Sequence, residues 1–139
     1  MRLRGAAVAL SCGAVIAVAA SLTPRASGQG THQELGLPAC SMLAETGYPC
    51  PSCGLTTSVA ATAHGRIAEA LSAQPFGVVL FAAVAVMGAA GAAELASGRD
   101  VIAVLRPSVW WVVAGLGGML LGWAWKLAWG CATGQYPLH

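Results

Sequence analysis

Three apolar stretches of membrane-spanning length dominate this chain of 139 residues. A bilayer core about 30 Å thick takes roughly 20 helical residues to cross, and irregular backbone cannot face lipid. Only 9% of the residues are charged, against about 25% in soluble domains, so lipid is the expected solvent. The sequence therefore predicts an all-α integral membrane protein that forms a single membrane domain over residues 1–139. Its three transmembrane helices are expected at about residues 5–22, 76–96 and 108–129.

The third stretch carries the strongest membrane signal. Tryptophans, which favour the two membrane–water interfaces, stand near both of its ends, at Trp110, Trp111, Trp123, Trp125 and Trp129. Between them, Ala114, Gly118 and Gly122 form a row of small residues at intervals of four. Such a row lets a neighbouring membrane helix approach closely. The expected contacts of the chain are therefore lipid and other membrane helices through this row.

The first stretch has two interpretations. Arg2 and Arg4 before a short apolar run also fit the plan of a secretory signal peptide. The apolar length is close to the spanning minimum, and no clean cleavage site of small residues follows it. We therefore expect an uncleaved helix, with Cys12 as a small buried residue inside it.

The arginines and lysine indicate an orientation. Positive residues are enriched on the cytoplasmic side of membrane proteins. With the N-terminus inside, that side holds Arg2, Arg4, Arg99 and Arg106, against Arg25, Arg66 and Lys126 outside. The segment 23–75 is therefore expected outside, with Cys40, Cys50 and Cys53, and Cys131 is expected there too. Glu94 is expected near the inner end of its helix, close to Arg99 and Arg106. Lys126 is expected to extend from the outer end of its helix to the interface.

The outer loop is expected to hold one or two short interfacial helices. Pro51 suits the first turn of a helix over about residues 51–63, with Cys50 at the N-cap, Cys53 in the first turn and Gly65 after the end. A second short helix is expected at about 66–73, because its apolar residues share one side. The segment 23–37, rich in Gly, Ser, Gln and Pro, is expected to be an irregular connection.

One part of this loop resembles a known family. The pattern Cys-Pro-x-Cys-Gly-x-Thr is formed by Cys50, Pro51, Cys53, Gly54 and Thr56, and a short helix, a Gly and a Pro before a membrane helix follow. It is similar to the bacterial membrane-protein family catalogued as domain of unknown function 2752, over about residues 37–80, and Cys40 fits as well. The resemblance implies a multi-pass protein of the bacterial inner membrane, without an established activity. The family commonly has Arg after the Thr, where this chain has Thr57.

The cysteines leave three interpretations open. In a structural role, Cys40 would form a disulfide with Cys50, Cys53 or Cys131 in an oxidising environment. In a redox role, Cys50 and Cys53 would form a thiol–disulfide pair with Cys40 as the shuttle thiol, as in a membrane oxidoreductase that resembles the disulfide-forming quinone reductases. In a metal-binding role, Cys40, Cys50 and Cys53 would hold zinc. His64 is too far along the predicted helix to join them, and His32 could join only by a loop excursion.

Other functions have little support in the sequence. The net charge of +2 is small and the basic residues do not cluster, so no nucleic-acid surface is indicated. The chain has no paired carboxylates, nucleophile elbow or phosphate-binding loop, and no cofactor-binding residues are identified. The sequence favours a structural or accessory membrane protein over an enzyme. The alternatives are a membrane thiol–disulfide oxidoreductase and a zinc-binding membrane protein.

Overall fold

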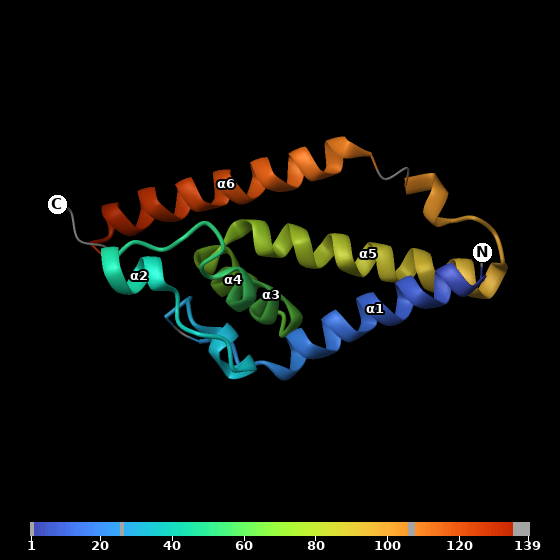
Figure 1. Ribbon diagram of the computed structural model, residues 1–139, viewed down its shortest axis with the longest axis horizontal. Helices are drawn as coiled ribbons and strands as arrows, with labels where there is room; N and C mark the ends of the chain where they lie inside the picture. Colours follow the sequence, from blue (N-terminus) through green and yellow to red (C-terminus); the bar gives the residue numbers. More distant parts are fainter. Residues whose placement is uncertain (1, 26, 106–107, 135–139) are drawn as a thin grey trace.

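A computed structural model describes residues 2–25, 27–105 and 108–134, and over these residues the chain is helical without strands (Figure 1). Three helices are long and apolar enough to cross a membrane, which makes this a multi-pass membrane protein by length and composition. They are α1 Arg2–Ser21, α5 Pro75–Ser97 and α6 Val109–Ala132. The predicted all-α fold with three membrane-length helices is confirmed. That they form one membrane domain stays a prediction.

Helices α1 and α5 pack closely because glycine faces glycine where they meet. A methyl group at Gly5 would come within 2.8 Å of the carbonyl oxygen of Gly91, and one at Gly91 within 2.8 Å of the Ala9 amide nitrogen. Farther along, the Cβ of Cys12 lies against Gly88. Small residues thus bring the two backbones together, as membrane helices without a hydrophobic driving force require.

A polar cluster ties the N-terminal end of α1 to the C-terminal end of α5. Glu94 is fully buried and accepts two hydrogen bonds from Arg4, at 3.1 and 2.8 Å, and one from the Ile102 amide at 3.2 Å. Arg4 also pairs with Asp100. The expected neighbours of Glu94 were Arg99 and Arg106. The first forms no ion pair with Glu94 in the structure, and the second lies outside the described residues.

The segment between α1 and α5 holds more helical structure than expected. It contains the 3₁₀ turn η1 Thr31–Leu35 and three short helices, α2 Ser41–Thr46, α3 Leu55–Ala63 and α4 Ile67–Ala73. The last agrees with the helix predicted at 66–73, but α2 was not predicted. Another short turn, η2 Ile102–Leu105, connects α5 to α6.

Buried hydroxyl groups hold the first part of this loop onto α3. Thr57 donates a hydrogen bond of 2.8 Å to Thr31, and both side chains are buried. Ser58 donates to the carbonyl oxygen of Gln74, at 2.7 Å, and is also buried. The segment predicted as an irregular connection is therefore part of the loop's core, because buried hydroxyls need partners that only a fixed chain supplies.

Helix α6 meets the others mainly near the cysteine end, and it diverges from α5 toward the opposite end (Figure 1). A methyl group at Gly118 would come within 2.9 Å of the Phe76 ring, and one at Gly122 within 3.2 Å of the Gln74 amide. The small-residue row thus receives side chains of the same protein at two of its three positions. The tryptophans of α6, such as Trp110 and Trp125, are largely exposed, as lipid-facing residues would be.

We expect Gly5→Leu to destabilise the protein and Gly13→Leu to leave it unchanged. A side chain at Gly5 would collide with the backbone of α5, whereas nothing lies within 4 Å of a Cβ at Gly13. Overpacking of this kind costs about 1–3 kcal/mol. Thermal unfolding of the two variants in detergent measures the difference. Equal, wild-type stability of both would indicate that α1 is removed as a signal peptide.

Candidate functional site

Three cysteines from two separate segments form the candidate site. Cys40 directly precedes α2, while Cys50 and Cys53 lie in a turn closed by a 2.9 Å hydrogen bond from the Cys53 amide to the Cys50 carbonyl. The predicted helix start at Pro51 is wrong, because α3 begins at Leu55 with Gly54 as its N-cap. Cys50 is therefore not an N-cap residue, and Cys53 lies before the helix rather than in its first turn.

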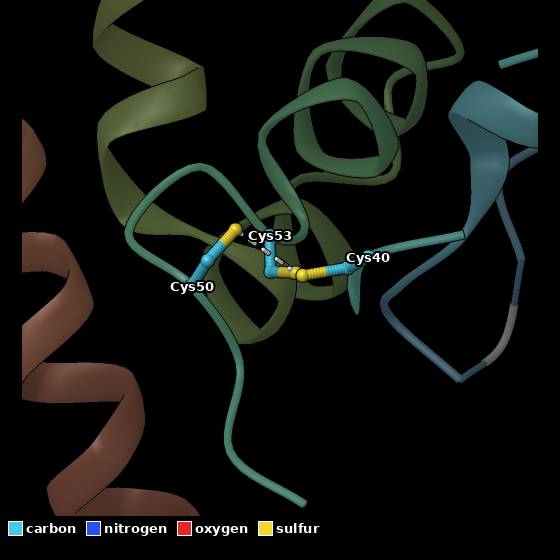
Figure 2. Close-up of side chains that lie close together, drawn as sticks. All are labelled: Cys40, Cys50 and Cys53. Carbon is cyan, nitrogen blue, oxygen red and sulfur yellow. Dashed lines mark hydrogen bonds between the residues drawn. The ribbon is translucent and has the colours of Figure 1, made fainter. Parts of the chain in front are cut away.

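The three thiols converge on one point. Their sulfur atoms all lie within 4.8 Å of one another, and Cys53 is buried whereas Cys40 and Cys50 are half-buried. The Cys50 thiol donates to the Cys53 sulfur at 3.3 Å. Figure 2 shows the side chains pointing toward one another, with Cys40 and Cys50 on opposite sides of Cys53. No pair of the described cysteines is joined in a disulfide.

The surroundings of Cys40 and Cys53 give these two thiols different pKa values. The backbone amide of Leu43 and the thiol of Cys53 stabilise the Cys40 thiolate and lower the pKa of Cys40 to about 7. Burial, followed by the Cys40 sulfur, raises the pKa of Cys53 to about 12. The thiol of Cys40 is thus the more acidic of the two, and the thiol of Cys53 stays protonated at neutral pH.

Gly54 permits the tight turn behind Cys53. Its φ is +87°, a conformation that other residues rarely adopt, and the space around it is filled. A methyl group there would lie 2.5 Å from the Lys126 ammonium and 2.6 Å from the Ala73 carbonyl oxygen. The glycine after the second cysteine is therefore required both by backbone conformation and by close packing.

Two side chains of α6 reach the cysteine turn. The Trp123 indole donates to the Pro49 carbonyl at 2.8 Å, and the Lys126 ammonium donates to the Cys53 carbonyl at 3.1 Å. Lys126 is only 7% exposed, and its positive charge acts on Cys53 and Cys50. The expectation that Lys126 extends to the interface is wrong, because the carbonyl of the turn offers its ammonium a partner inside the protein.

A third polar side chain supports the turn from the junction of α4 and α5. The fully buried Gln74 donates weakly, at 3.3 Å, to the carbonyl oxygen of Pro51 and, at 3.4 Å, to that of Met119 in α6. It thus joins the cysteine turn to α6 through one amide group. The oxygen of its side-chain amide is buried without a hydrogen-bond partner among the described residues.

With this geometry in view, comparison with known proteins identifies a family. Residues 40–88 match the family described as "Protein of unknown function (DUF2752)". Over this segment the chain is similar to that family. No curated protein and no solved structure matches the chain. The family description gives no activity.

The DUF2752 segment includes all three cysteines of the site and reaches into α5. Other candidates from the sequence lie elsewhere. Cys12 is inside α1, and Cys131 in α6 is not part of the group of three. His64 bonds the Leu22 carbonyl at 3.0 Å and does not join the sulfurs.

The Cys-Pro-x-Cys-Gly-x-Thr motif contains only some of the residues that form the site, and other residues of the site lie elsewhere in the chain. Thr57 is buried against Thr31. Sequence reasoning missed Trp123, Lys126 and Gln74 as parts of the site. The only signal for Lys126 was a lysine within an otherwise apolar helix, and polar residues in membrane helices do mark functional sites.

Proposed function

We propose that this chain is a membrane protein whose first loop binds one soft metal ion, with Zn²⁺ the first choice, through Cys40, Cys50 and Cys53. The observation that carries the proposal is the convergence of the three sulfurs. Zinc–sulfur bonds of about 2.3 Å place tetrahedral sulfur ligands about 3.8 Å apart. The sulfur separations, all within 4.8 Å, need only side-chain rotations to reach this value.

The donor set also favours a metal over a single structural disulfide. A disulfide uses two sulfurs and would leave the third thiol beside it without a role, whereas a metal ion uses all three. Thiolates are the ligands that select Zn²⁺ or Cu⁺ in proteins. A bound ion would fix the loop against α6, which agrees with an accessory, non-enzymatic role.

Metal content tests this proposal. Purified wild-type protein should carry about one zinc per chain, and Cys40→Ser, Cys50→Ser and Cys53→Ser should each lose it because thiolate ligands are removed. Cys12→Ser and Cys131→Ser are matched controls and should keep the metal. Elemental analysis by mass spectrometry gives the ratio. A metal-free wild type, or five variants with equal zinc, would refute the proposal.

A second candidate function is thiol–disulfide exchange, which the approach of the Cys40, Cys50 and Cys53 sulfurs to within 4.8 Å of one another favours. The Cys40 thiolate would attack a disulfide of a partner protein, form a mixed disulfide and release one partner thiolate. Cys53 or Cys50 would then attack the Cys40 sulfur, release the second partner thiolate and leave a disulfide in this chain. Two electrons pass to the partner, and the two protons of the thiols leave with them.

Alkylation of the reduced, metal-free protein measures how reactive the thiols of Cys40 and Cys53 are as nucleophiles. The pKa of Cys40, about 7, predicts that its reaction rate with iodoacetamide rises as pH passes through 7 and then levels off. Cys53 should stay slow up to pH 9, because its pKa is about 12. Peptide mass spectrometry at pH 5–9 follows both residues. Equal rates for the two cysteines would contradict this division of roles.

We further propose that the protein lies in a bacterial inner membrane with the cysteine loop outside. The start of α1 and the connection from α5 to α6 carry four arginines, against Arg25, Arg66 and Lys126 on the side of the cysteine loop, and the positive-inside rule favours the first side as cytoplasmic. A membrane-impermeant thiol reagent should then reach Cys40 in intact, reduced cells. Labelling that requires lysis would reverse the orientation.

A further inference from the structure

A cavity of about 380 Å³ adjoins the cysteine cluster. Its lining includes Cys40 and Cys53 together with side chains of the segment before α2. Arg25, His32 and Gln33 are among these side chains. Two of the three proposed metal ligands therefore border a space large enough for a small molecule.

The proposed ion would have one coordination position left for that space. Zinc is usually four-coordinate, and three protein ligands with an open fourth position mark a site where ligands exchange. Among the described residues, no fourth His, Cys, Asp or Glu joins the group. His32 lines the cavity, but its Nε2 atom is hydrogen-bonded to the Pro38 carbonyl at 3.1 Å.

The chemistry of the lining selects the ligand. Arg25 brings a guanidinium group, and none of the described lining residues is acidic, so a carboxylate is favoured there. Arg25 is held by a hydrogen bond of 3.2 Å from its Nη1 atom to the side-chain oxygen of Gln33, and its main chain is held on Thr31. An ion with three thiolate ligands accepts a fourth soft donor, and a thiolate is the softest that small metabolites offer.

We propose that this cavity admits a small acidic thiol, of tripeptide size, whose thiolate takes the fourth position on the ion and whose carboxylate pairs with Arg25. The proposal rests on the metal site proposed above. The incoming thiol loses its proton to water when its sulfur binds, and no electron is transferred. The cavity would thus be the route by which the ion is exchanged with a thiol carrier.

Cobalt provides the test, because Co²⁺ in sulfur sites reports its ligands by visible absorption. Full-length protein loaded with Co²⁺ is titrated with reduced glutathione, with S-methylglutathione and with cysteamine. Glutathione should change the spectrum at concentrations at least about tenfold lower than cysteamine, which has a thiol but no carboxylate. S-methylglutathione, which has no free thiol, should leave the spectrum unchanged.

Variants complete the test. Arg25→Gln should weaken glutathione binding about tenfold and leave cysteamine binding unchanged, whereas Arg99→Gln, at the opposite end of the molecule, should change neither. Equal affinities for glutathione and cysteamine would overturn the cavity proposal and leave the metal site standing. A change in the thiol-free cobalt spectrum of His32→Ala would also overturn it, because the chain would then supply the fourth ligand. Failure to bind Co²⁺ or Zn²⁺ at all would refute both proposals.

Discussion

Gly54→Ala is expected to disrupt the cysteine turn and to lower the stability of the protein by about 2–5 kcal/mol. A left-handed conformation costs a residue with a side chain about 1–2 kcal/mol, and overpacking adds about 1–3 kcal/mol. The new methyl group would meet the Lys126 ammonium, the Ala73 carbonyl and the Gly28 carbonyl, and two of these three are rigid backbone. Metal content should fall together with stability, because the same turn carries Cys50 and Cys53.

Gly65→Ala is the matched control. Gly65 also has a positive φ, +72°, but nothing lies within 4 Å of a Cβ there. Its substitution should cost only the conformational part, about 1–2 kcal/mol. Thermal unfolding and zinc analysis of both variants separate backbone strain from crowding. Equal losses at the two positions would show that the packing around Gly54 contributes nothing.

Lys126→Met should weaken zinc binding about 10–100-fold, which is the usual effect of removing a group that supports metal ligands. Three thiolates and one Zn²⁺ ion carry a net charge of −1, and Lys126 is the buried cation beside them. Methionine keeps most of the volume and removes the charge and the hydrogen bond to Cys53. Competition with a chromophoric zinc chelator measures the affinity.

Trp123→Phe distinguishes the effect of the Lys126 charge from the effect of holding the cysteine turn against α6. This variant removes the hydrogen bond to Pro49 but leaves a ring and the charge of Lys126 in place. It should lower thermal stability and change zinc affinity less than threefold. If both variants weakened zinc binding to the same extent, the tether between α6 and the turn, rather than the ammonium charge, would account for the effect.

The three long helices were predictable because lipid imposes a length and a composition on each helix. The predicted spans 5–22, 76–96 and 108–129 agree with α1, α5 and α6 to within three residues at each end. The partners of the charged residues were not predictable in this way. Arg4 pairs with Glu94 across ninety positions of sequence, and only helix packing brings them together.

The candidate site could be predicted in part. The spacing of Cys50 and Cys53 and the neighbouring prolines indicated a constrained pair, and Cys40 was grouped with them. The start of α3 was misplaced because Pro51 suits a first helical turn, whereas the chain uses the left-handed Gly54 to begin the helix four residues later. The fixed packing of Thr31 and the inward turn of Lys126 depend on partners distant in sequence, for which local patterns give no signal.

The contact between Lys126 and the cysteine turn has a consequence for biosynthesis. The ribosome makes Cys53 seventy-three residues before Lys126, so the three thiols leave it well before the helix that contacts their turn. At about 5–20 residues per second, this delay lasts roughly 4–15 s. A nascent chain therefore passes through a period in which the turn has no contact with Trp123 or Lys126. If the loop binds an ion as proposed, the ion would enter from the α6 side in this period, and later exchange would use the cavity beside Arg25.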